Sequence, residues 1–105
     1  MHYVEVPVEA KPIEQWSDAD IGARYEHPAS RALRVLQEGH GDGVKRFVFV
    51  LPDAIGAAGE TVRLLALSAA RQWRDDGVTV NCIVGGDNDA AIAFLSSGAV
   101  TGVTL

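Results

Sequence analysis

Two continuous apolar runs, separated by one long helical pattern, constrain this fold more than any other feature. Residues 45–51 read KRFVFVL and residues 78–84 read VTVNCIV, and β-branched and aromatic side chains dominate both. Such runs are typical of strands buried on both faces of a parallel sheet. The helical pattern covers residues 60–73, and its apolar spacing is set by Val62, Leu65, Ala66, Ala69 and Trp73. A strand, a helix and a second strand in this order predict a right-handed parallel crossover.

The N-terminal third extends the same alternation. Residues 3–8 alternate apolar and polar side chains, as in a half-buried edge strand. Ser17 suits the N-cap of a short helix that ends near Arg24. A longer helix is predicted next, with Pro28 at its first position and Gly39 just after its end.

The C-terminal segment adds one more helix and strand. Asp87 or Asn88 suits an N-cap, and a short helix follows that ends at Gly98. Residues 100–105 then read as a last short strand. The alternation predicts one domain, residues 1–105, of the α/β class with a small, mostly parallel sheet of three or four strands flanked by helices.

Composition excludes several functional classes. The net charge of −5 and the scattered basic residues argue against nucleic-acid binding. No apolar run approaches the roughly 20 residues that cross a bilayer, and the N-terminus carries acidic residues where a signal peptide would be basic. Cys82 is the only cysteine, so neither an internal disulfide nor a cysteine-rich metal site is expected. We therefore expect a cytoplasmic protein that binds neither membranes nor nucleic acid.

Four segments together resemble the second half of a short-chain dehydrogenase/reductase (SDR). Residues 11–20 (KPIEQWSDAD) resemble the lead into the family's long interface helix, and residues 45–51 take the place of the strand that carries its catalytic serine. Residues 65–86 resemble the active-site helix and the strand after it, and residues 90–105 resemble the closing segment. The resemblance implies a truncated Rossmann-like domain with three α/β/α layers.

The residues for the family's chemistry are absent. The glycine-rich dinucleotide motif belongs to the missing half, and the positions of the family's Tyr-x-x-x-Lys hold Ile55 and Gly59. The strand end reads Leu51-Pro52-Asp53, without a serine. Because the reaction needs a phenol that exchanges a proton and a cofactor that carries the hydride, we expect a pseudoenzyme with no catalytic residues and no cofactor. Its three histidines show no ligand spacing, so we expect no metal either.

A remodelled ligand cleft is the alternative. The loops after the two buried strands bring several small or acidic residues to one end of the expected sheet: Asp53, Gly56, Gly59, Gly85 and Gly86. Free backbone N–H groups at a helix start can bind an anion there. Such a cleft would make the chain a small-molecule binding module, or an oxidoreductase-like component with new chemistry.

The first hypothesis is instead a non-catalytic, oligomerising subunit. A half domain leaves a sheet edge and a helix face uncovered, and both favour association. In the family, the two helices matched here pack against the same helices of a partner subunit. We expect either a homo-oligomer or a hetero-oligomer with a full-length SDR enzyme, through an interface that includes Leu33, Leu36, Val62, Leu64, Leu67 and Trp73.

Overall fold

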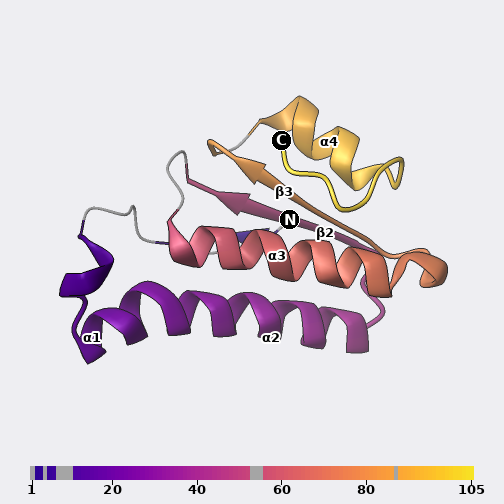
Figure 1. Cartoon of the computed structure of the whole chain (residues 1–105). Helices are drawn as coiled ribbons and strands as arrows, with labels where there is room; N and C mark the ends of the chain where they lie inside the picture. The colour runs from indigo at the N-terminus through magenta and orange to yellow at the C-terminus, as the bar shows by residue number, and fades with distance from the viewer. Residues whose placement is uncertain (1, 4, 7–10, 53–55, 87) are drawn as a thin grey trace.

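The central strand β2 (Arg46–Leu51) organises an α/β fold with a small parallel sheet (Figure 1). The computed structural model describes residues 2–3, 5–6, 11–52, 56–86 and 88–105. In chain order the elements are β1 (His2–Tyr3), η1 (Ile13–Gln15), α1 (Asp18–Ile21), η2 (Gly22–Glu26), α2 (His27–Gly41), β2 (Arg46–Leu51), α3 (Ala57–Gln72), η3 (Arg74–Asp76), β3 (Thr79–Val84) and α4 (Asp89–Ser96).

The strands lie in the order β1-β2-β3, and both pairs are parallel. Every residue of β2 pairs with β3, from Arg46 opposite Thr79 to Leu51 opposite Val84. The pairing of β1 extends over two residues only, so the predicted strand at residues 3–8 is much shorter among the described residues. Val4, Pro7 and Val8 lie outside them.

The C-terminal segment runs along the free edge of β3. The Cys82 N–H donates to Val103 O at 2.9 Å, and Cys82 O accepts from the Leu105 N–H at 2.9 Å. One parallel bridge, between Cys82 and Thr104, is formed. The predicted last strand is therefore present as a single bridge with ladder-like hydrogen bonds, which place residues 102–105 beside β3.

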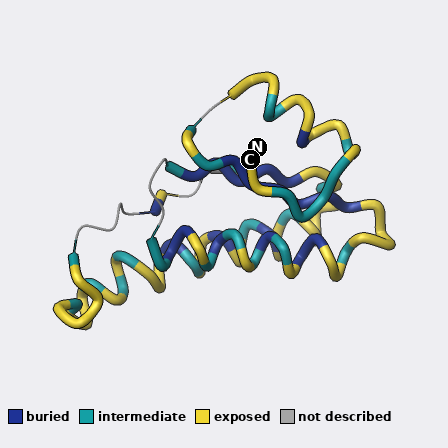
Figure 2. The backbone as a smooth tube through the Cα atoms, turned by 45° about the horizontal axis from the view of Figure 1, so that its top comes forward, coloured by how far each residue is buried: buried dark blue, intermediate teal, exposed yellow. Residues whose placement is uncertain are grey.

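Helices cover both faces of the sheet. Phe47, Phe49 and Leu51 of β2 point toward α2 and α3 and are almost fully buried. On the opposite face, Val48 and Ile83 pack with Leu95 of α4. Figure 2 shows the result, with buried strands between helices that are exposed on their outer sides.

The last two crossover connections, through α3 and through α4, have opposite handedness. The chain steps from β2 to β3, and then from β3 to residues 102–105, in the same direction across the sheet. The connecting helices α3 and α4 lie on opposite faces. The general preference for right-handed crossovers therefore fails for one of them. The sequence could not reveal this, because a short apolar helix such as α4 suits either face.

The N-terminal helices form one continuous arm. Ser17 caps α1 as predicted, since its hydroxyl accepts from the Asp20 N–H while the Asp20 carboxylate accepts from the Ser17 N–H. The predicted end near Arg24 is wrong, because the π-helix η2 joins α1 directly to α2. Pro28 lies in the first turn of α2, and because it has no backbone N–H it interrupts the hydrogen-bond ladder that continues from η2.

Gly39 does not stop α2, contrary to the prediction. The helix continues to Gly41, and the turn comes at Gly43, whose φ of +81° favours glycine. A Cβ on Gly39 would lie 2.6 Å from the ring of Phe47. The glycine is therefore needed for close packing of α2 against β2 and not for the helix end.

Candidate functional site

The predicted glycine cleft is only partly assembled. Gly85 and Gly86 follow β3 with φ values of +104° and +86°, and both amides donate to Leu51 O, at 3.1 and 3.2 Å. Gly56 caps α3, and Gly59 is buried in the first turn of that helix. Asp53 lies outside the described residues. The glycine amides at the end of β3 therefore hold the two strand ends together and do not offer donors to an anion.

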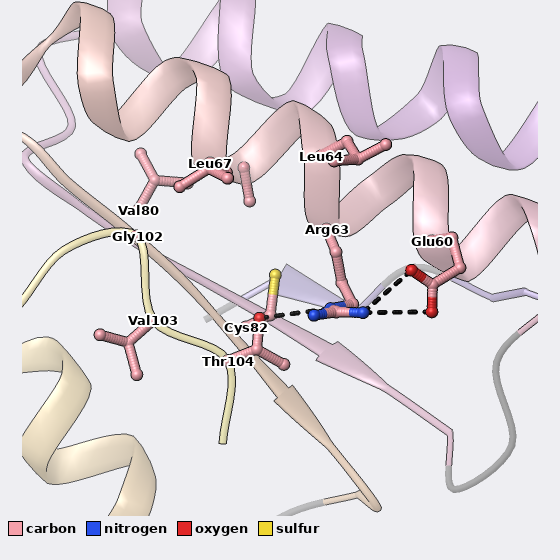
Figure 3. Close-up of a pocket in the computed structure, with 10 residues that line it drawn as sticks. Glu60, Arg63, Leu64, Leu67, Val80, Cys82, Gly102, Val103 and Thr104 are labelled. Carbon is pink, nitrogen blue, oxygen red and sulfur yellow. Dashed lines mark hydrogen bonds and ion pairs between the residues drawn. The ribbon is translucent and has the colours of Figure 1, made fainter.

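A separate pocket of about 250 Å³ lies beside α3, over the free edge of β3 (Figure 3). Its floor includes Val80 and Cys82 of β3 and Gly102 and Thr104 of the adjacent segment, which share one face of the sheet. Its wall is the side of α3 that carries Glu60, Arg63, Leu64, Ala66 and Leu67. We call this cavity the α3 pocket.

Gly102 shapes the floor of the α3 pocket. It has a φ of +75°, and a Cβ there would lie 3.2 Å from Leu67 Cδ1. Its N–H donates to Val80 O at 2.9 Å. The absence of a side chain lets Leu67 lie close to the last segment of chain while the backbone stays paired with β3.

The polar side chains of the α3 pocket form a connected series of interactions. The Nη1 of Arg63 donates to both carboxylate oxygens of Glu60, at 2.9 and 3.1 Å, and its Nε lies 3.5 Å from the Thr104 hydroxyl oxygen. That hydroxyl also interacts with the Cys82 thiol. The arrangement places one cation between an exposed carboxylate and a buried thiol (Figure 3).

Cys82 is an inert member of this pocket. Only 1% of its surface is exposed, and burial raises the pKa of its thiol to about 11, although the nearby Arg63 and Thr104 act in the opposite direction. The thiolate is the reactive form of cysteine. Cys82 therefore acts as a small buried side chain of the main core.

The histidines take part in ring contacts. His40 stacks on Trp73 with ring centroids 4.3 Å apart, and His2 stacks on Phe47 at 5.3 Å. Burial lowers the pKa of His2, which disfavours its charged form. Within the described part of the chain, no group of three or more acidic, cysteine or histidine residues could hold a metal ion.

The predicted interface residues divide into two groups. Leu36 and Val62 are 3% and 0% exposed and belong to the core of the chain itself, so a partner cannot reach them. Trp73 is half-buried against that core and is covered by His40. Leu33 and Leu64 are 43% and 64% exposed and remain available to a partner. Leu67 is half-buried at the rim of the α3 pocket.

The α3 pocket has no counterpart in the sequence prediction. Arg63 and Thr104 are 41 residues apart, and only the pairing of residues 102–105 with β3 brings them together. The alternation within β3 alone indicates that Val80 and Cys82 share a face, because every second residue of a strand points to the same side.

Comparison with known proteins finds no relative. No family model matches the chain, and no curated protein and no solved structure matches it. Among the described residues, no helix has the length and apolar character needed to cross a membrane. The resemblance to the SDR family therefore stays a prediction, and the functional argument depends on the structure itself.

Proposed function

We propose that the chain is a non-catalytic SDR-like subunit that assembles through the outer surface of α3, with a second copy or with a full-length dehydrogenase/reductase. The observation that carries this proposal is one line of side chains on α3: Glu60, Leu64, Leu67 and Arg71. We call it the α3 stripe. Its members follow one another at spacings of four, three and four residues, which align them along one side of a helix.

The α3 stripe is complementary to itself. It carries an acid at its N-terminal end, two leucines in the middle and a base at its C-terminal end. In an antiparallel pair of identical helices, Glu60 of each copy faces Arg71 of the other, and Leu64 faces Leu67. A two-fold interface requires this kind of self-complementary surface.

Exposure of the leucines supports the same surface. Leu64 is 64% exposed on a helix whose opposite side is fully buried, and Leu33 on the adjoining helix α2 is 43% exposed. Burying an exposed leucine contributes about 1.5–3 kcal/mol. An assembly would therefore cover the two most exposed leucines of the paired helices.

The layering supports a Rossmann-like interpretation of the fold. Parallel strands joined by helices, with α2 and α3 on one face and α4 on the other, match the expected C-terminal half of such a domain (Figure 1). The family's lysine position is occupied by Gly59, inside the first turn of α3. Both lysines lie elsewhere, since Lys11 is paired with Asp20 and Lys45 precedes β2. A role without the family's catalysis fits these placements.

Charge reversal tests the assembly. We expect the purified chain to have at least twice the monomer mass by light scattering. Glu60→Arg or Arg71→Glu should each dissociate it, because like charges would then meet across the interface. The double variant Glu60→Arg/Arg71→Glu should restore the assembly by exchanging the two charges. Arg74→Glu, which lies outside the α3 stripe, is the matched control and should leave the mass unchanged.

The choice of partner needs a second measurement. The chain should be co-expressed with any full-length dehydrogenase/reductase that is encoded beside it, and the mass of the purified material should be compared with that of the chain alone. A joint complex that Glu60→Arg disrupts would identify the chain as a subunit of that enzyme. A monomer in both preparations, with no effect of the charge reversals, would contradict the proposal.

A further inference from the structure

The α3 pocket has the features of a small ligand site. It measures about 250 Å³, slightly below the roughly 300–1,000 Å³ of drug-sized sites. Its apolar lining is firm, because Val80, Cys82 and Ala66 are at most 2% exposed. Only a small molecule fits this space, and a dinucleotide does not.

One cation at the pocket has unused hydrogen-bonding capacity. A guanidinium carries five N–H donors. In Arg63, Nη1 is taken by Glu60 and Nε faces the Thr104 hydroxyl, while Nη2 has no acceptor among the described residues. Glu60 thus holds the guanidinium in place and leaves one of its edges for an incoming oxygen.

The negative charge of Glu60 limits the charge of a ligand that can bind Arg63. The Glu60 carboxylate lies within 3.1 Å of the guanidinium, so a ligand with two negative charges would be repelled strongly. A single carboxylate can share the guanidinium with Glu60 and form a charge-assisted hydrogen bond. The exposed Leu64 and the half-buried Leu67 offer apolar surface for an aliphatic chain.

We propose that the α3 pocket binds a small monocarboxylate with a short aliphatic tail. The carboxylate meets Arg63 Nη2 and the Thr104 hydroxyl, and the tail lies against Leu64 and Leu67. This inference does not depend on the SDR-like assembly. The two surfaces overlap, because Glu60, Leu64 and Leu67 belong to both the pocket and the α3 stripe.

A titration of the whole isotope-labelled chain with sodium butyrate, followed by amide NMR at constant ionic strength, tests the proposal. We expect saturable shifts at Val80, Gly102 and Thr104. Butan-1-ol, which lacks the charge, should produce much weaker shifts. Inorganic phosphate should also bind more weakly, because of Glu60.

Two variants move the affinity in opposite directions, so loss of folding cannot explain both. Arg63→Gln should weaken butyrate binding about tenfold or more, since a hydrogen bond to a charged group contributes about 1.5–3 kcal/mol. Glu60→Gln should strengthen it, because the competing carboxylate is removed. Arg74→Gln makes the same charge change outside the pocket and should leave the affinity unchanged.

Three results would overturn the proposal. The first is a set of shifts that do not saturate, and the second is equal binding of butyrate and butan-1-ol. The third is binding that is absent from the assembled protein and appears only after Arg71→Glu has separated the subunits, because this would mean that a partner's side chains fill the pocket. The mass measurement on the charge-reversal variants is independent of all three, so failure of this site and failure of the assembly are distinguishable.

Discussion

The two faces of the sheet are covered by helices but are held by different contacts. Toward α2 and α3, the core contains three large, almost fully buried side chains of β2: Phe47, Phe49 and Leu51. Toward α4, a smaller hydrophobic cluster contains Val48, Ile83 and Leu95. Apolar packing therefore dominates the first face, and the second face needs additional contacts.

Those additional contacts come from Asn81. This side chain is fully buried on the α4 face, where its Nδ2 donates to Val100 O at 3.1 Å and its Oδ1 accepts from the Val103 N–H at 2.9 Å. Both hydrogen bonds are needed, because a buried side-chain amide without hydrogen-bond partners would destabilise the fold. On the α4 face, where the apolar core is small, the hydrogen bonds of Asn81 therefore hold the C-terminal segment against β3.

The largest expected effect tests the apolar side of this comparison. Phe49→Ala should lower the free energy of unfolding by about 3–5 kcal/mol, since it opens a cavity in the main core. Leu95→Ala should cost less, near the lower end of the range of about 2–5 kcal/mol, because α4 can collapse onto a thinner core. Urea unfolding of both variants measures the difference. Equal losses would mean that the two faces contribute alike.

The sequence predicts the elements that depend on apolar burial better than those that depend on specific tertiary contacts. The strongly apolar segments β2, α3 and β3 were predicted correctly because their patterns are decided by burial alone. The end of α2 was predicted wrongly, since Gly39 is required by the ring of Phe47, a contact that sequence spacing does not contain. Two of the six interface residues, Leu36 and Val62, are instead buried in the core.

The site was harder to predict than the fold. Gly85 and Gly86 follow β3, but their amides donate to Leu51 O, and Gly59 lies inside α3 and not in the preceding loop. The α3 pocket arises from the pairing of Thr104 with Cys82, which depends on the direction in which the last segment crosses the sheet. That direction is a property of the tertiary structure, so no local pattern indicates it.

A smaller effect tests the polar side of the comparison. Asn81→Ala leaves the Val100 carbonyl and the Val103 N–H without this partner, at a total cost of about 1–3 kcal/mol because both groups are only partly buried. Hydrogen exchange should show faster exchange at Val103 than in the wild type. The control is Thr79→Val, which removes a buried hydroxyl that has no partner among the described residues and should be neutral or stabilising. Equal destabilisation by both variants would contradict the role given to Asn81.

The smallest effect concerns the N-terminal segment formed by η1, α1 and η2, which extends the comparison to a region without buried residues. The ion pair with Lys11, at 2.6 Å, and the hydrogen bond from the Ser17 N–H hold the pKa of Asp20 far below its ordinary value. Because the folded pKa is lowered, this contribution is present above about pH 4, the ordinary value for aspartate, and is lost as the pH falls below it.

Asp20→Asn should therefore lower the urea midpoint at pH 7, and the difference from the wild type should shrink toward pH 3. Lys11→Met should have a similar effect alone, and adding it to Asp20→Asn should change little further, because the two side chains act as one pair. A difference between wild type and Asp20→Asn that stays constant from pH 7 to pH 3 would mean that this pair does not stabilise the arm. In that case the continuous helix with α2 would position this segment, and Asn81 would be the last polar side chain in the comparison that stabilises the fold.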